Sequence, residues 1–489
     1  MQPSSGSSAH GWTMDDDLPK LLAEFNGKGY VIAPAGYGKT HLIARAVQAA
    51  TRRQLVLTHT YAGVNAIRRK MQLLRIPPTH YQIDTIASWA LRTCLYFPKT
   101  SKWKKDHPAG KDWGKLYGAC AALLNKPFVQ HMIKCSYGGV YVDEYQDCSD
   151  QQHELVESLA KLLPCRLLGD PMQAIFDFGE PPIDWNVAVY PNYQLLGELK
   201  TPWRWKLAQA DELGEWLSQA RALLAENQKI PLSGQLPNGV RHCAVDLNDF
   251  GNKKRLSVFY DHLKNQDSVI AIHAGDQKSK NKTHKLAQSI AGKFSSLEEV
   301  EGKDLFRFIK KIDSAKSAGE RLRSVIDFCK TCCNAVDGVL TAATKRGQEG
   351  KATKATKCPE ILNVANRYLA TGSFKDMAIL LDLVRGHPEV TTYRRDLFGR
   401  MIGVLRVHED NPSLTLTEAA KRYQREFRHS GRPIRHNKLI GTTLLVKGLE
   451  YDHAIILEAE SMSSKHLYVA LTRGAKSITI VTTGNDVPG

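Results

Sequence analysis

The sequence lacks any long apolar run. In its 489 residues no apolar stretch approaches the roughly 20 residues that a membrane-spanning helix needs. Residues 1–13 are rich in Ser and Gly and contain no apolar segment, so we expect a disordered N-terminus and no secretory signal. These absences predict a cytoplasmic protein that has no membrane partner.

Acidic residues are few relative to basic ones. The chain carries 50 Asp and Glu against 67 Lys and Arg, a net charge of +17 at pH 7. This excess favours a polyanionic partner, with nucleic acid first, and charge for solubility is the alternative. The length exceeds what one hydrophobic core supports and predicts about two to four domains.

The ten cysteines lack the repeated paired spacing of a metal cluster. Cys329, Cys332, Cys333 and Cys358 come nearest to it, but no second pair and no nearby histidine completes the set. We therefore expect free thiols in a reducing compartment, with a zinc or iron–sulfur site as the alternative.

A glycine-rich motif from Ala33 to Thr40 (A-P-A-G-Y-G-K-T) follows the apolar run at 30–32 and precedes a helix-forming run at 41–46. Strand, glycine turn and helix are the context of a phosphate-binding loop, in which backbone N–H groups and the helix N-terminus hold phosphate. Lys39 would reach the β- and γ-phosphates, and the Thr40 hydroxyl would bind magnesium. Ala33 stands where the usual pattern has Gly.

Two carboxylates follow a second buried strand about 100 residues later. The apolar run at 139–142 leads directly into Asp143 and Glu144. In phosphoryl transfer one such carboxylate holds magnesium and another polarises the attacking water. We predict the first role for Asp143 and the second for Glu144.

Strands alternate with helices in both halves of the chain, which predicts an α/β protein with two parallel-sheet domains, each interrupted by an insertion. Within the run at 95–136, the segment 99–115 mixes lysines with Trp103 and Trp113 and indicates either a contact with duplex or single-stranded nucleic acid or a solvated charged face. The expected parts are a disordered stretch at 1–13, a first domain at 14–94 and 137–204, a small basic insertion at 95–136, a second domain at 205–312 and 436–489, and a basic helical insertion at 313–435.

In their order the motifs resemble those of superfamily 1 DNA helicases of the UvrD/Rep/PcrA type, from about residue 25 to 483. The resemblance implies two RecA-like domains with inserted, mainly helical accessory subdomains, ATP in the cleft between the domains, and 3′–5′ movement on single-stranded DNA. The segments that carry it are 35–40, 58–62, 85–88, 143–147, 169–178, 203–204, 447–451 and 467–474.

The resemblance also implies roles for single residues, with Arg204 and Arg473 reaching the γ-phosphate from the second domain. The catalytic set is Lys39, Asp143, Glu144, Gln173, Arg204 and Arg473. The residues expected to bind ATP are Ala35, Gly36, Tyr37, Gly38, Lys39, Thr40, Arg45, Trp203, Gly448 and Glu450, and those expected to bind magnesium are Thr40 and Asp143. The DNA-binding set is Thr60, Tyr61, Thr85, Ser88, Phe176, Phe178 and Trp205, with core packing as the alternative for Phe178 and Trp205.

The predicted function is an ATP- and magnesium-dependent 3′–5′ DNA helicase or translocase acting on single strands and on duplex/single-strand junctions. Two departures from the family pattern are the missing Gln-containing motif before residue 30 and the run Ser463–His466 before the last motif. Short insertions and no nuclease segment after that motif leave an alternative, a DNA-stimulated ATPase that controls a partner nuclease in bacterial phage defence. A non-catalytic nucleic-acid-binding protein and an RNA substrate also stay open.

Overall fold

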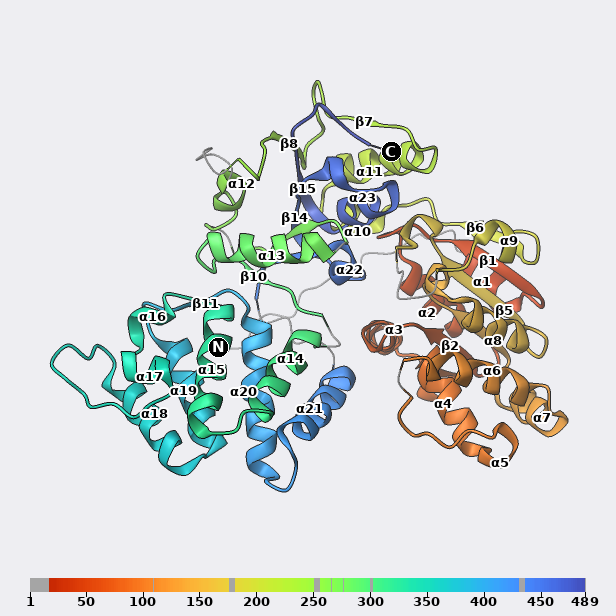
Figure 1. The fold of residues 1–489 in the computed structure, drawn as a ribbon. Helices are drawn as coiled ribbons and strands as arrows, with labels where there is room; N and C mark the ends of the chain where they lie inside the picture. The colour runs from red at the N-terminus through yellow and green to blue at the C-terminus, as the bar shows by residue number, and fades with distance from the viewer. Residues whose placement is uncertain are drawn as a thin grey trace, which may run out of the picture. The chain divides into compact units, whose positions relative to one another are not determined.

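A computed structural model describes residues 17–108, 110–175, 181–249, 256–264, 266–275, 277–299, 302–430 and 436–488 (Figure 1). The chain divides into two compact units, unit 1 at residues 1–204 and unit 2 at residues 205–489. None of the described helices combines the length and the apolar character needed to cross a membrane.

Unit 1 is built on a six-stranded parallel sheet in which the central strands are buried on both faces, as is usual for parallel sheets. In spatial order the strands are β3 (Tyr81–Thr85), β2 (Gln54–Thr58), β4 (Gly139–Val142), β5 (Cys165–Gly169), β1 (Lys28–Ile32) and β6 (Gln194–Glu198). The helices are α1 (Asp17–Glu24), α2 (Lys39–Ala49), α3 (Tyr61–Leu73), α4 (Ile86–Tyr96), α5 (Pro98–Ser101), α6 (Asp112–Leu124), α7 (Pro127–Ser136), α8 (Asp150–Ala160) and α9 (Trp185–Ala188), and the 3₁₀ turns are η1 (Pro78–His80), η2 (Tyr145–Asp147) and η3 (Pro171–Gln173).

The helices α5, α6 and α7 do not form a core of their own. Leu116, Cys120 and Leu123 of α6 belong to the same buried cluster as Leu55 of β2 and Val140 of β4. The expectation of a separate small insertion at 95–136 is therefore corrected. Of the lysines at 99–115, only Lys115 lies within α6, between apolar positions that belong to this cluster or pack against it. The other lysines of that segment precede the helix and are Lys99, Lys102, Lys104, Lys105 and Lys111.

Unit 2 contains a second six-stranded parallel sheet. Its strands are, in spatial order, β10 (Ser295–Ser296), β13 (Lys438–Thr442), β9 (Val269–His273), β14 (Tyr451–Ile456), β15 (Gly474–Thr482) and β8 (Val240–Ala244). The accompanying elements are α10 (Trp203–Leu207), which begins in unit 1, α11 (Asp211–Ala225), α12 (Ser257–Tyr260), α13 (Gln277–Ser289), α22 (Thr443–Val446), η5 (Ala459–Ser461), α23 (Ser464–Leu471) and the antiparallel pair β7 (Ile230–Pro231) and β16 (Asp486–Val487). The two parallel sheets confirm the predicted α/β fold class.

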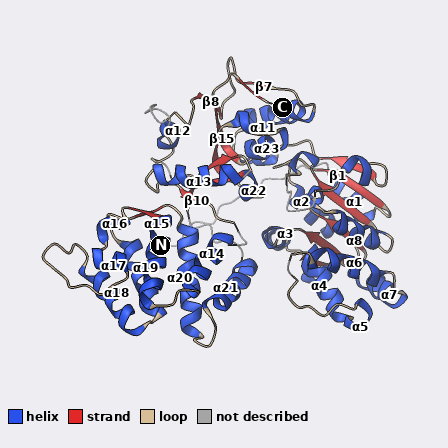
Figure 2. Ribbon diagram, in the orientation of Figure 1, coloured by secondary structure: helices blue, strands red, loops and turns tan. Residues whose placement is uncertain are grey.

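A helical body interrupts the second sheet between β10 and β13 (Figure 2). Its helices are α14 (Lys303–Asp313), α15 (Ala318–Cys332), α16 (Val336–Val339), α17 (Ala342–Arg346), α18 (Pro359–Thr371), α19 (Phe374–Gly386), α20 (Arg395–Asp410) and α21 (Leu416–Ser430), with one short antiparallel pair, β11 (Cys333–Asn334) and β12 (Thr391–Thr392). Its buried cluster starts at Leu305, so the body begins about ten residues before the predicted position 313. Cys329, Cys332, Cys333 and Cys358 are free thiols inside this cluster.

The two sheets share one local turn. After β4 the chain passes through Asp143 to Glu144, which has a φ of 55° and precedes η2. After β14 it passes through Leu457 to Glu458, which has a φ of 50° and precedes η5. Because Leu457 stands where unit 1 has Asp143, this turn of unit 2 does not offer the first of the two carboxylates.

Candidate functional site

The phosphate-binding motif forms the turn between β1 and α2. Gly36 and Gly38 have φ angles of 79° and 91°, a left-handed conformation that glycine adopts without steric cost, and α2 starts at Lys39. The turn is fixed to the sheet because the Ala33 N–H donates to the Gly169 carbonyl of β5 at 2.9 Å. The N-terminus of α2, with the positive end of the helix dipole, thus begins directly at the glycine turn, as an anion site requires.

The two predicted carboxylates lie against Lys39. Its ammonium nitrogen is 2.7 Å from Glu144 Oε1 and 3.5 Å from Asp143 Oδ1. The backbone N–H of Asp143 donates to Leu57 O at 2.8 Å, which continues the pairing of β4 with β2 and fixes the carboxylate at the strand end. Strand pairing and the glycine turn together bring Lys39 into one ion-pair cluster with two adjacent carboxylates that follow it by about 100 residues in sequence.

Burial and charge shift the proton affinities of this cluster. Burial acts to lower the pKa of Lys39, but the charges of Glu144 and Asp143 outweigh it and hold that pKa above its usual value. Burial raises the pKa of Asp143 to about 6, against the opposing attraction of Lys39. Asp143 Oδ1 is buried and accepts no hydrogen bond from the described residues, and its charge is balanced by the Lys39 ammonium at 3.5 Å. A carboxylate oxygen with no hydrogen-bond donor is suited to bind a magnesium ion when Lys39 moves to a phosphate.

A hydrogen-bonded chain continues from Glu144 into the loop after β5. Gln146 Nε2 donates to Glu144 Oε2 at 2.5 Å, and Gln146 Oε1 accepts the backbone N–H of Asp170 at 3.1 Å. Gln173 Nε2 donates to Asp170 Oδ2 at 3.3 Å. No role for Gln146 or Asp170 was predicted from the sequence, although Gln146 lies within the same five-residue acidic motif as Glu144.

The other residues predicted to bind ATP are spread over both units. Arg45, one turn into α2, is exposed and donates to Gln48. Trp203 opens α10, Gly448 has a left-handed φ of 78°, and Glu450 is exposed. Their roles stay predictions.

The two predicted arginines have different positions. Arg204 lies in unit 1, where its backbone N–H donates to Gly36 O at 2.9 Å, so the expectation that it comes from the second domain is corrected. Arg473 lies in unit 2 and is 2 % exposed, and its guanidinium donates to Val469 O, Leu449 O and Thr472 Oγ1 at 2.8–3.1 Å. A contact of Arg473 with a nucleotide stays a prediction and requires these hydrogen bonds to be exchanged.

Four of the predicted DNA contacts gather at the N-terminal ends of α3 and α4. The hydroxyls of Thr60 and Thr85 cap these helices, accepting N–H groups at 3.0 and 2.9 Å, and Tyr61 OH and Ser88 Oγ are 2.7 Å apart. Thr60 is exposed, whereas Thr85 is 3 % exposed. Thr60, Tyr61 and Ser88 are therefore more accessible to a nucleic acid than the buried Thr85.

The three aromatic residues of the DNA-binding prediction have separate outcomes. Phe176 and Phe178 lie outside the described residues. Trp205 is 1 % exposed and donates its indole N–H to Gly474 O at 2.8 Å within unit 2. Base stacking by Trp205 is therefore corrected to core packing, because a base cannot reach the face of a fully buried ring.

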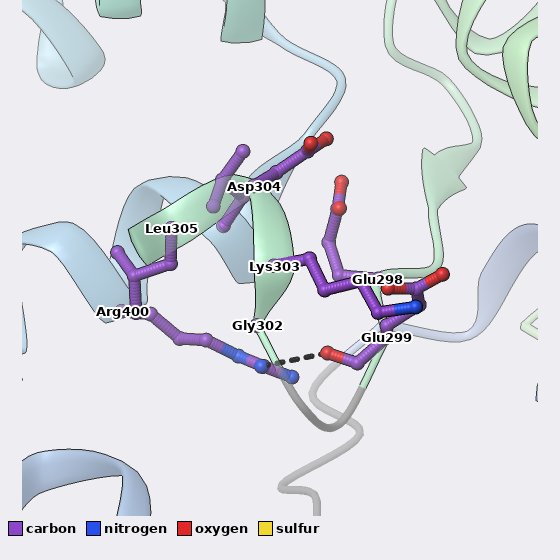
Figure 3. Close-up of a pocket in the computed structure, with 8 residues that line it drawn as sticks. Glu298, Glu299, Gly302, Lys303, Asp304, Leu305 and Arg400 are labelled. Carbon is purple, nitrogen blue, oxygen red and sulfur yellow. Dashed lines mark hydrogen bonds between the residues drawn. The ribbon is translucent and has the colours of Figure 1, made fainter. Parts of the chain in front are cut away.

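A further polar cluster lies at the edge of the helical body. Within the described part of the chain, His284, Glu298 and Asp304 place ligand atoms within 4.8 Å of one another. Arg394 fills this cluster, since it donates to Glu298 at 2.6 and 2.7 Å and to Asp304 at 2.5 Å. Figure 3 shows the adjoining cavity, where Arg400 donates to a backbone carbonyl at 2.9 Å. The guanidinium supplies the positive charge that a metal ion would bring, so this cluster is an ion-pair network.

Residues 102–189 match the model of the UvrD/REP helicase N-terminal domain. The matched segment includes Asp143, Glu144, Gln146 and Gln173 but not Lys39. This match supports a helicase-like function for the chain.

Solved structures with a similar arrangement come from an arterivirus. They are a complex of Arterivirus nonstructural protein 10 (helicase) with DNA, with a TM-score of 0.34, and a crystal structure of Arterivirus nonstructural protein 10 (helicase), with a TM-score of 0.35, each at 10% sequence identity. Each match covers 96% of this chain, which spans 63% and 61% of those two chains. No curated protein matches the chain in sequence.

Proposed function

We propose that the protein is an ATP-dependent 3′–5′ DNA helicase or translocase that hydrolyses ATP on single-stranded DNA. The observation that carries the proposal is the placement of Lys39 against both Asp143 and Glu144, at the ends of β1 and β4. A lysine at a glycine turn facing two carboxylates after a neighbouring strand is the arrangement that nucleoside triphosphate hydrolysis uses.

The described residues fit a magnesium–nucleotide complex. Thr40 and Asp143 would hold the ion, which supplies neutralisation of the phosphate charge when bound. Backbone N–H groups at Gly36 and Gly38 would bind phosphate oxygens, and Lys39 would leave Glu144 to contact the terminal phosphates. Glu144, released from Lys39, would then accept a proton from the attacking water.

The N-terminal ends of α3 and α4 support a nucleic-acid contact. Both helices follow strands of the same parallel sheet, and the positive ends of their dipoles attract phosphate. Tyr61 and Ser88 would add hydroxyl contacts to the backbone of a single strand. The net charge of +17 supports a binding affinity that falls steeply with salt concentration.

ATP hydrolysis by the full chain, measured with and without a single-stranded oligonucleotide, tests the proposal. We expect the oligonucleotide to raise kcat at least roughly tenfold, and duplexes with a 3′ tail to be separated in preference to those with a 5′ tail. Hydrolysis that does not respond to single-stranded DNA would overturn the DNA motor. Preferential separation of 5′-tailed duplexes would overturn the polarity alone.

A further inference from the structure

Gln146 occupies a buried position between two loops that end neighbouring strands. It lies in η2, after β4, and is 0% exposed. Both ends of its amide are used: Nε2 donates to Glu144 Oε2 at 2.5 Å, and Oε1 accepts the N–H of Asp170, after β5, at 3.1 Å. One side chain thus connects the loop after β4 to the loop after β5.

The chemistry of the two partners fixes the orientation of this amide. The backbone N–H of Asp170 can only donate, and the ionised carboxylate of Glu144 can only accept. Rotation of the amide by 180° would place its NH₂ group against the N–H of Asp170 and its oxygen against the carboxylate of Glu144, and both hydrogen bonds would be lost. Gln146 can hold Glu144 in one direction only.

A glycine provides the space for this amide. A Cβ added at Gly169 would lie 2.6 Å from Gln146 Oε1 and 2.9 Å from Cζ2 of Trp185. At such distances something must move, so only glycine at this point of β5 lets Gln146 approach Asp170. The close approach of backbone and amide is a second observation, independent of the hydrogen bonds, that defines the position of Gln146.

The connection extends beyond Gln146 on both sides. Glu144 uses its other oxygen, Oε1, to contact Lys39 at 2.7 Å. Asp170 uses Oδ2 to accept from Gln173 at 3.3 Å and Oδ1 to accept a backbone N–H at 3.2 Å. Lys39 and Gln173, both in the predicted catalytic set, are therefore joined through Glu144, Gln146 and Asp170.

We propose that Gln146 is a positioning residue that orients Glu144 toward the attacking water and ties this orientation to the loop that carries Gln173. The inference rests on the proposed function. When a nucleotide draws Lys39 away from Glu144, the hydrogen bond from Gln146 still holds the carboxylate of Glu144 in its orientation toward the attacking water. In this proposal Gln146 acts on hydrolysis through Glu144, whose orientation its second hydrogen bond ties to the loop after β5.

A double-mutant cycle in the full chain tests this inference. Gln146→Leu keeps the size of the side chain and removes both hydrogen bonds, and we expect kcat for single-stranded-DNA-stimulated ATP hydrolysis to fall about 10- to 100-fold with KM for ATP within about twofold of wild type. Glu144→Gln alone is expected to lower kcat about 10²- to 10³-fold. Because Gln146 acts through Glu144, adding Gln146→Leu to Glu144→Gln should lower kcat by less than about twofold more.

Gln54→Leu is the matched control, since Gln54 is 3% exposed on β2 of the same sheet and donates to Arg52 O at 2.8 Å without contacting Glu144. Its effect on kcat should be the same with and without Glu144→Gln. If Gln146→Leu does not fold, Gln146→Asn keeps an amide that is one methylene too short to reach Glu144 and enters the same cycle.

The outcomes separate the two proposals. Suppose that the wild-type chain hydrolyses ATP but Gln146→Leu lowers kcat by the same factor with and without Glu144→Gln. That result would overturn the role of Gln146 alone, and so would a loss of nucleotide affinity as large as the loss of kcat. A wild-type chain that hydrolyses no ATP would overturn the proposed function and this inference with it. A non-additive cycle with KM unchanged supports the positioning role.

Discussion

The ammonium group of Lys39 lies 2.7 Å from Glu144 Oε1, so the residue predicted to bind phosphate contacts the residue predicted to polarise water. The side chain of Lys39 is 10% exposed and that of Asp143 is 6% exposed, so the positive charge balances carboxylates that have little access to solvent. A buried cation between two acids stabilises the cluster only as long as all three are present.

Replacement of Lys39 by Ala should therefore affect activity and stability together. We expect ATP hydrolysis to fall about 10²- to 10³-fold, because a positive charge near the terminal phosphates is lost. The free energy of unfolding at pH 7 should fall by about 1–3 kcal/mol, below the value for fully buried pairs because the Glu144 side chain is 33% exposed. Steady-state kinetics and urea unfolding measure both effects.

Lys28→Ala is the matched control for this substitution. Lys28 contacts Glu157 at 3.0 Å in the same unit, away from the phosphate-binding turn. The substitution Lys28→Ala should leave the rate of ATP hydrolysis unchanged. Wild-type hydrolysis by Lys39→Ala would contradict the assignment of the turn.

Gly169→Ala should weaken both the sheet and the site. The new methyl group would meet Gln146 Oε1 and the ring of Trp185, and overpacking of this kind costs about 1–3 kcal/mol. Displacement of Gln146 should also lower kcat. Gly118→Ala is the control, because Gly118 is exposed in α6 with no atom within 4 Å of an added Cβ, and we expect it to stabilise by about 0.5–1 kcal/mol. Equal unfolding free energies and equal kcat values for ATP hydrolysis in the two variants would contradict this account.

The phosphate-binding turn and the carboxylates after β4 could be predicted from the sequence because their signals are local. Glycines between an apolar run and a helical run define the turn at 33–40, and the structure has β1, turn and α2 in that order. Two parallel sheets also follow from the alternation of strands and helices, without knowledge of which strands pair.

Interactions between distant segments could not be predicted in the same way. Gln146 and Asp170 are 24 residues apart, and their hydrogen bond depends on β4 and β5 being neighbours in the sheet. The lysines of 95–136 suggested a separate insertion, but the apolar positions 116, 120 and 123 of α6 belong to the same buried cluster as residues of the sheet. The lysines dominate the composition of this segment, but the packing of its apolar residues determines where it lies in the fold.

The pH dependence of stability should contain a contribution from Glu458 in unit 2. Its carboxylate accepts hydrogen bonds from Lys282 at 2.6 Å and Asn248 at 2.8 Å and lies 3.4 Å from His273. The close contact with His273, and then the hydrogen bonds from Lys282 and Asn248, lower the pKa of Glu458 from 4.5 to about 2, although burial opposes this. A carboxyl with a lowered folded-state pKa contributes stability above pH 4.5 that is lost as the pH falls toward 2.

This shift corresponds to about 1–3 kcal/mol at neutral pH, because solvent screens part of the charge of a carboxylate at the surface. Glu458→Gln should therefore destabilise the protein at pH 7 and much less at pH 2.5, as measured by urea unfolding. The control is Glu460→Gln, an exposed carboxylate in the same 3₁₀ turn, which should have little effect at either pH. A cost of Glu458→Gln that is equal at both values would show that the carboxylate charge does not contribute.

Trp205 supplies the last prediction, because the sequence left its role open between base stacking and core packing. The ring is 1 % exposed and its N–H is bonded to Gly474 O at 2.8 Å. Trp205→Phe should lower the free energy of unfolding by about 1–3 kcal/mol, since it leaves a buried carbonyl without its donor. Trp205→Ala should cost about 3–5 kcal/mol through loss of buried area.

A stacking residue would behave differently in a binding assay. Removal of a base–aromatic stack weakens single-stranded DNA binding by about 1–3 kcal/mol. If Trp205 only packs, Trp205→Leu, which removes the aromatic ring, should leave the DNA affinity of the folded protein within about twofold of wild type. Fluorescence anisotropy with a labelled oligonucleotide, at a temperature where the variant is folded, measures this. Tyr61→Phe is the comparison, because Tyr61 lies partly exposed at the start of α3, and loss of its hydroxyl should weaken DNA binding without a comparable loss of stability. A larger loss of DNA affinity for Trp205→Leu than for Tyr61→Phe would show that Trp205 contacts nucleic acid.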